Sequence, residues 1–433
     1  MMKLFVILFL TATIMYGEVP LQNGKFPEIK YEGKGHFYLQ KHEGRYLFIT
    51  PKGEGFYPIG INHLNVLFNK GVQGKSEVAV KKDLLDNMVN WGFNCGGYGT
   101  GPQLIKDGMY YIGSLNIAKQ GFYHLEHAQF PDVFSDSFAT SLENNFKKTA
   151  QWTYKPDRLM GMVWTDLPAW NLHKSRMLRN TDWVSQIRLL GVEADGKKAY
   201  VSFLKQRYEG NMEKLKEYYS LSDDNLRALE EYDFSILYLG HPTIIKDDEV
   251  FMVEIAKKYY HLGNQFHDQY FPNIPLLGDR FLLGDHPDAI LKVAAKYVDA
   301  ISVQIGDGYG ESMPSSYPYP KDTMDHIHAL TGKPVLIADH QISFYTKDYK
   351  YTTFSQAGSE SDASLETMKF LHESYSSQYI CGYFRCTYLS QHEPHGRGVK
   401  QGVVDFKQNP YSKMAHAYSC FNNEIEKYIE GEK

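Results

Sequence analysis

Short apolar runs alternate with longer amphipathic segments along most of the chain. Residues 160–164 and 335–338 are continuous apolar runs, which is typical of strands buried on both faces of a parallel sheet. Segments 77–91 and 321–330 instead repeat apolar residues at the three- and four-residue spacing of a helix. The pattern predicts eight strands, at residues 56–63, 93–98, 108–113, 160–164, 275–280, 299–304, 333–339 and 379–385.

Eight strands that alternate with helices indicate an α/β protein with a (β/α)₈ barrel. Residues 34–56 read as a β-hairpin cap before the barrel, with a turn at His42-Glu-Gly44. Residues 171–245 contain several helical segments and no strand signal, which predicts a helical insertion after the fourth strand. No internal repeat or low-complexity linker interrupts the pattern, so we expect one domain over residues 18–433.

The N-terminus has the pattern of a secretory signal. Lys3 precedes the apolar run 4–16, which ends at Gly17, and the run is shorter than the about 20 residues that a spanning helix needs. We therefore expect residues 1–17 to be a signal peptide and the protein to be secreted or periplasmic. No later segment is expected to span a membrane.

Composition narrows the range of partners. The chain is 43% hydrophobic and 22% charged, as in ordinary globular proteins, and its net charge of -5 gives no reason to expect nucleic acid. Aromatic residues make up 15% of the chain, with 33 Tyr. Exposed aromatic rings stack on sugar faces, so this content is compatible with carbohydrate binding.

No metal or other cofactor is expected. Cys95, Cys381, Cys386 and Cys420 have no zinc spacing, and the first three fall in or beside predicted core strands, which favours buried free thiols. The histidine pairs at 124 and 127 and at 392 and 395 lack the spacing of a helical HExxH zinc site.

Two predicted strands end in a carboxylate. Asp166 follows the fourth strand and Asp339 follows the seventh. In such a barrel, the carboxyl ends of all strands lie at one face, so both acids are expected there. Glycosidic hydrolysis needs such a pair, one protonated and one ionised. The alternative is that each Asp only caps a strand end or a helix.

Other polar and aromatic residues are expected at the same face. They are candidates for binding substrate: Asn62, His63, Tyr98, Trp164, Trp170, Arg280, Gln304, Asp307, His340, Arg385 and Tyr388. Trp164 and Trp170 are expected to raise the pKa of Asp166 by desolvation, which would suit it to the acid role.

His340 or Arg385 is expected to keep Asp339 ionised. Arg280 and Arg385 are candidates for sulfate or carboxylate groups on a sugar, because the Arg fork matches such anions. Ion pairs with nearby Asp residues are the alternative, and a hydrogen-bonded core position is the alternative for His63.

The sequence resembles the agarase-like glycoside hydrolases of the large retaining (β/α)₈ clan. The stretches that carry the resemblance are Gly35-His-Phe-Tyr through Gly60-Ile-Asn-His63, Trp91-Gly-Phe-Asn94, Phe130-Pro-Asp-Val-Phe134, Val298-Asp-Ala-Ile-Ser302 and Pro334-Val-Leu-Ile337. The resemblance implies a barrel fold and a galactan or other algal-type polysaccharide as substrate.

Both acids depart from the pattern of that clan. The resemblance implies Glu at the ends of strands four and seven, where this chain has Asp166 and Asp339. Each shorter side chain withdraws its carboxyl by about 1.5 Å. The gap between the carboxyls is then expected to widen towards the inverting range of about 6.5–9.5 Å, away from the retaining 5–5.5 Å.

Three functions remain open at this point. The first is a secreted glycoside hydrolase that cleaves a complex, anionic or galactan-type polysaccharide with Asp166 and Asp339. The second is a carbohydrate-binding protein without activity on a degenerate barrel. The third is a polysaccharide lyase that uses His63, His340 or a Tyr as base. Fold alone does not choose among them.

Overall fold

The computed structural model describes residues 21, 24–69, 75–118, 129–166, 168–237, 240–284, 286–305, 318–350, 356–391 and 400–431. The expected signal segment 1–17 lies outside these residues. Among the helices that are described, none is long and apolar enough to cross a membrane.

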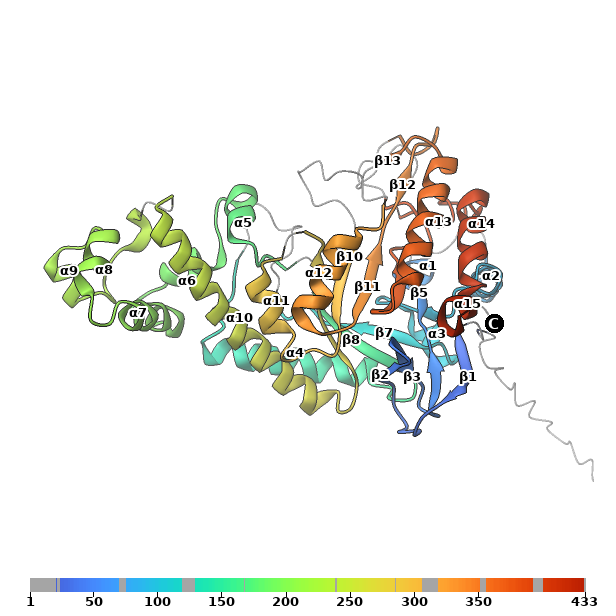
Figure 1. Cartoon of the computed structure of the whole chain (residues 1–433), viewed down its shortest axis with the longest axis horizontal. Helices are drawn as coiled ribbons and strands as arrows, with labels where there is room; N and C mark the ends of the chain where they lie inside the picture. The colour runs from blue at the N-terminus through green and yellow to red at the C-terminus, as the bar shows by residue number, and fades with distance from the viewer. Residues whose placement is uncertain are drawn as a thin grey trace, which may run out of the picture.

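Eight parallel strands close into a barrel, as the alternating pattern predicts (Figure 1). The strands follow one another in chain order around the barrel, and β9 and β10 also pair in parallel. The first strand is shorter than expected, because Phe56 pairs with Phe48 in the N-terminal sheet instead. The barrel strands are β5 (Ile59–Ile61), β6 (Cys95–Gly96), β7 (Tyr111–Ser114), β8 (Leu159–Asp166), β9 (Leu276–Leu282), β10 (Ile301–Ile305), β11 (Val335–His340) and β14 (Ile380–Arg385).

An antiparallel sheet closes the N-terminal end of the barrel. It is larger than the expected hairpin and has four strands in the order β1-β4-β3-β2: β1 (Lys25–Lys30), β2 (Tyr38–His42), β3 (Arg45–Ile49) and β4 (Glu54–Phe56). Phe37, Phe48 and Phe56 form one buried cluster with barrel residues near the strand starts, including Leu336 and Cys381. Because this end is plugged, the opposite end is the one that exposes the strand termini.

Helices surround the barrel and begin where the sequence places their caps. Ser135 caps α4 by accepting from the amide of Phe138, and Gly332 ends α12 with a φ of 67°. The helices are α1 (Val66–Asn69), α2 (Glu77–Asn90), α3 (Pro102–Lys106), α4 (Asp136–Thr153), α10 (Pro242–Tyr270), α11 (Asp288–Ala294), α12 (Lys321–Thr331), α13 (Glu360–Ser376), α14 (Ser412–Asn422) and α15 (Ile425–Glu430). A small parallel pair, β12 (Ser343–Phe344) and β13 (Gln356–Ala357), lies above the strand ends.

A set of helices that lies between β8 and α10 in the chain projects from one side of the barrel (Figure 1). These are α5 (Leu172–Arg179), α6 (Trp183–Arg188), α7 (Asp195–Arg207), α8 (Met212–Tyr218), α9 (Asp223–Arg227) and the 3₁₀ turn η2 (Phe234–Ile236). Buried ion pairs tie them to the start of α10. Asp248 lies 2.7 Å from Arg188 and 2.5 Å from Arg176, so the insertion is anchored through charge as well as through its apolar core.

The cysteines are free in the structure. Cys95, Cys381 and Cys386 are buried thiols, as predicted from their positions in core strands, and Cys420 is half-buried on α14.

Candidate active site

Strand register brings four polar side chains to one level at the open end of the barrel. Asp166 on β8 pairs with Arg280 on β9, and Gln304 on β10 pairs with Asp339 on β11. Gln304 donates from Nε2 to Asp166 Oδ1 at 2.5 Å, and Nη2 of Arg280 lies 3.6 Å from Oδ2 of the same carboxylate. The neighbouring strands therefore hold the carboxylate of Asp166 from both of its oxygens.

Tyr98 links this group to the second carboxylate. Its hydroxyl donates to Oδ2 of Asp339, a residue that is only 8% exposed. The guanidinium of Arg280 lies over the Tyr98 ring, 3.9 Å from its centroid. Oδ1 of Asp339 is buried and has no hydrogen-bond partner among the described residues. Tyr98 thus contacts the cation beside Asp166 through its ring and donates to Asp339 through its hydroxyl.

The end of β5 completes the wall of the site. Asn62 donates from Nδ2 to the carbonyl of Ala338 at 2.9 Å, which fixes its side chain against β11. His63 has a φ of 57°, an uncommon conformation for a residue with a side chain. Its ring stands edge-on to Tyr98 at 4.8 Å, and its Nε2 is buried without a partner in the described part of the chain. Strained backbone of this kind clusters at functional sites.

The pKa values of the two carboxyls are shifted in opposite directions, and each shift runs opposite to the direction expected from the sequence. Burial, together with the nearby charge of Asp166, raises the pKa of Asp339. Burial alone would raise the pKa of Asp166 as well, but Arg280 and Gln304 outweigh it and hold this pKa below the usual value. Asp339 therefore has the higher pKa and holds its proton more readily than Asp166, the reverse of the sequence-based assignment.

Two further basic residues, His63 and Lys400, belong to the electrostatic environment of the pair. Burial and the charges of Lys400 and Arg280 lower the pKa of His63 to about 3, so its imidazole stays neutral. The charge of Lys400 also lowers the pKa of both Asp166 and Asp339. Lys400 was missed in the sequence because it follows the last barrel strand by 15 residues, in a stretch without any strand or motif signal.

Both tryptophans lie outside this site. Trp164 is fully buried on the helix side of β8, against Tyr259 and Tyr260 of α10. Trp170 is also fully buried and stacks on Trp183 with ring centroids 5.0 Å apart. Neither ring is therefore open to a sugar, and neither explains the pKa of Asp166.

Three other candidates serve the packing around β11 and β14. His340 stacks on Phe370 at 3.9 Å and bonds the Tyr383 hydroxyl at 2.8 Å. Arg385 is fully buried and donates to the carbonyls of His340, Ile342 and Gln401 at 2.9–3.1 Å. Among the described residues it makes no ion pair with an Asp, which was the alternative role expected for it. Tyr388 stacks on Trp91 and accepts from Asn87 at 2.6 Å.

Some candidates cannot be placed. Asp307 and the histidines at 124, 127, 392 and 395 lie outside the described residues. Within the described ranges, no group of three or more His, Cys, Asp or Glu side chains is arranged to hold a metal ion.

The fold of this chain matches those of several solved structures. No family model matches the chain, and no curated protein matches its sequence. Against the structure of an exo-beta-agarase the TM-score is 0.76 at 16% identity, over 93% of this chain and 67% of that one. The agarase AgWH50C gives the same TM-score and identity over 93% and 66%. The chain has the fold of these agarases.

Two further solved structures match with lower TM-scores. BpGH50 superposes with a TM-score of 0.65 at 15% identity, over 93% of this chain and 84% of that one. A beta-galactosidase from the psychrophilic Marinomonas ef1 gives 0.55 at 10% identity, over 86% and 60%. This chain spans about two thirds of the length of the two agarases. At identities this low, the structural similarity establishes the architecture alone, and the activity has to be argued from the site.

Proposed function

We propose that the protein is a secreted glycoside hydrolase that cleaves a galactan-type polysaccharide, with Asp339 as general acid and Asp166 as its ionised partner. The observation that carries the proposal is the opposite shift of the two carboxyl pKa values within one connected group of side chains. A pair of acids whose environments separate their pKa values is the arrangement that glycosidic hydrolysis requires.

The chemistry divides between the two carboxyls. Asp339 gives its proton to the leaving glycosidic oxygen as the bond to the anomeric carbon breaks. Asp166 either removes a proton from the attacking water or attacks the anomeric carbon itself. Two Asp in place of two Glu favour the wider spacing and hence the water route, with inversion at the anomeric carbon. The Tyr98 hydroxyl then stabilises Asp339 once its proton has left.

The charge around the pair supports an anionic sugar as substrate. Arg280 is held beside Asp166 and Tyr98, and the charge of Lys400 reaches both carboxyls. Cations at such a position favour a sugar that carries sulfate or carboxylate, because they attract these negatively charged groups.

A lyase is less well supported. It needs a base whose pKa is near neutrality, whereas burial and Asp339 raise the pKa of Tyr98 well above its usual value. Burial lowers the pKa of both His63 and His340, and His340 is fully buried against Phe370.

A panel of algal and host polysaccharides tests the proposal, with reducing ends and ultraviolet absorbance followed together. Asp166→Asn and Asp339→Asn are the test variants, and Asp322→Asn on the exposed start of α12 is the matched control. New reducing ends without absorbance, lost in both test variants only, support the hydrolase. Absorbing products indicate a lyase instead. Binding without turnover, equal in all variants, indicates a carbohydrate-binding protein.

A further inference from the structure

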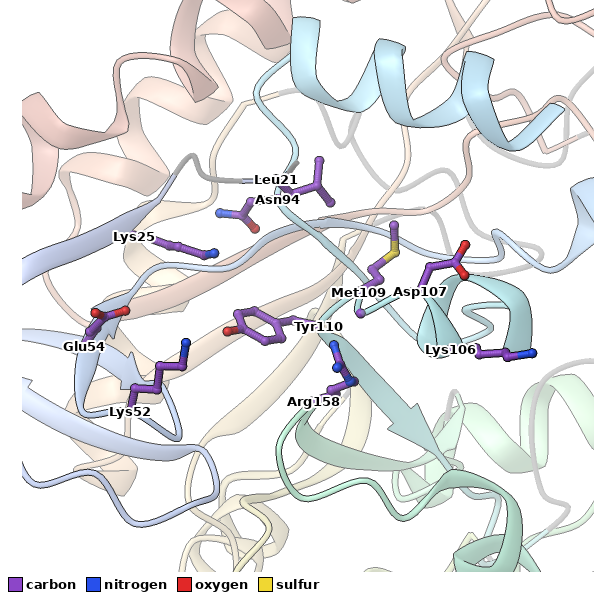
Figure 2. Close-up of a pocket in the computed structure, with 11 residues that line it drawn as sticks. Leu21, Lys25, Lys52, Glu54, Asn94, Lys106, Asp107, Met109, Tyr110 and Arg158 are labelled. Atoms are coloured by element: carbon purple, nitrogen blue, oxygen red, sulfur yellow. The ribbon is translucent and has the colours of Figure 1, made fainter. Parts of the chain in front are cut away.

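A polar cavity lies at the opposite end of the barrel from Asp166 and Asp339. It has a volume of about 200 Å³ and opens where the N-terminal sheet meets the strand starts (Figure 2). A single water needs only about 10–15 Å³, so the cavity is large enough for a polyatomic ligand. Lys25, Lys52 and Glu54 come from the sheet, and Tyr110 and Arg158 precede β7 and β8.

The basic side chains gather around one aromatic ring. In Figure 2, Lys25, Lys52 and Arg158 lie about Tyr110. The ammonium of Lys25 is 5.6 Å from the centroid of that ring, and the rings of Phe37 and Phe56 contact it edge-on at 4.8 Å and 5.5 Å. The phenol is therefore fixed in place by the packing that plugs the barrel, and the cations stand beside a rigid wall.

Two acids line the cavity, and each also faces a lysine outside it. Asp107 is 2.5 Å from Lys81 on α2, and Glu54 is 3.4 Å from Lys30 on β1. Asp157 approaches Nε of Arg158 at 3.4 Å, but its side chain is 59% exposed, so this pair is weak. The lining therefore keeps an excess of positive charge that an entering anion would meet.

Glycine at position 108 makes room for the arginine. A Cβ at Gly108 would lie 2.7 Å from Nη1 of Arg158, and its φ of 106° already disfavours a side chain. The guanidinium thus packs closely against this turn, where a side chain at position 108 would displace it.

We propose that this cavity is an anion-binding site for a tetrahedral oxyanion, either free or as the sulfate ester of a sugar. The carriers of binding are Lys52 and Arg158, with Lys25 and Tyr110 as further walls. Arginine and lysine together match such a group, because the guanidinium donates two parallel hydrogen bonds while the ammonium supplies a point charge. The site does not depend on the proposed hydrolase activity, since it shares no residue with it.

Calorimetric titration at constant ionic strength tests the site with inorganic sulfate, and with galactose 6-sulfate against galactose. The variants are Lys52→Gln alone and Lys52→Gln with Arg158→Gln. Lys369→Gln, an exposed and paired lysine on α13, is the control that removes the same charge elsewhere. We expect wild type and control to bind sulfate alike, and each lost cation to weaken binding about tenfold.

The sugar arm separates the two sources of the anion. Tighter binding of galactose 6-sulfate than of inorganic sulfate assigns the site to sulfated saccharides, and the reverse order assigns it to a free oxyanion. Perturbation of the Arg158 Nε–H resonance of wild-type protein by sulfate is a second readout that needs no variant. Sulfate affinity equal in the double variant and the control, or no response of Arg158, overturns the proposal.

Discussion

Asp279 is a buried carboxylate that fixes the loop after β8, and its replacement gives a stability signature with a defined sign. Its side chain is fully buried and accepts from Tyr259 at 2.7 Å, Tyr260 at 2.9 Å and Trp170 Nε1 at 3.0 Å. Burial raises its pKa from 3.8 to about 6, although these donors act in the opposite direction. The group joins β9 and α10 to Trp170, four residues beyond Asp166.

The raised pKa makes the folded state bind a proton more tightly than the unfolded state. The contribution of Asp279 to stability is therefore complete below pH 3.8 and is lost as pH rises through about 6. A difference of about 2 between the folded and unfolded pKa values corresponds to about 3 kcal/mol of unfolding free energy. Asp279→Asn removes this pH dependence, and it also sets an amide donor against the indole donor of Trp170, which costs about 1–3 kcal/mol.

Urea unfolding, followed by circular dichroism and tryptophan fluorescence from pH 4 to 7.5, measures both effects. Asp279→Asn should be less stable than wild type at pH 4, and this deficit should shrink by about 2–3 kcal/mol as pH rises. Asp268→Asn, at an exposed position on α10, should have the same unfolding free energy as wild type across this pH range. A deficit that is constant with pH, or that grows with it, would refute the reasoning.

Two further variants probe the carboxyl pair. Tyr98→Phe removes a donor that lowers the pKa of Asp339, so the alkaline limb of the pH–rate profile should move upward while the acidic limb stays in place; an unmoved alkaline limb contradicts the acid role. Arg280→Met removes the main charge that lowers the pKa of Asp166. The variant should lose about 1–3 kcal/mol of unfolding free energy at pH 7, a deficit that fades as pH falls and Asp166 becomes protonated, as urea titrations would show.

The barrel could be predicted because its strands are buried on both faces. Continuous apolar runs such as 335–338 leave few other structures, and the rule that strand carboxyl ends share one face then places Asp166 and Asp339 together. The N-terminal sheet was underestimated, because the pairing of Lys25 with Phe56 joins segments that are far apart in sequence and have no local signal.

The roles of the two acids could not be predicted from neighbours in sequence. Trp164 is two residues before Asp166, and simple alternation would place both on one side of β8. A shift of register between Val163 and Asp166 separates them, so Trp164 packs against α10 while Asp166 meets Gln304. Such irregularities depend on contacts between strands, as does the charge of Lys400, and a single sequence does not carry them.

The reversed order of the acids is tested most directly with activated substrates. Once the panel names the sugar, its dinitrophenyl glycoside supplies a leaving group that needs no proton. Asp339→Asn should lose hydrolysis of the polysaccharide and keep that of the dinitrophenyl glycoside, whereas Asp166→Asn should lose both. If Asp166→Asn instead keeps the activated substrate and Asp339→Asn loses both, Asp166 is the acid and the account is contradicted.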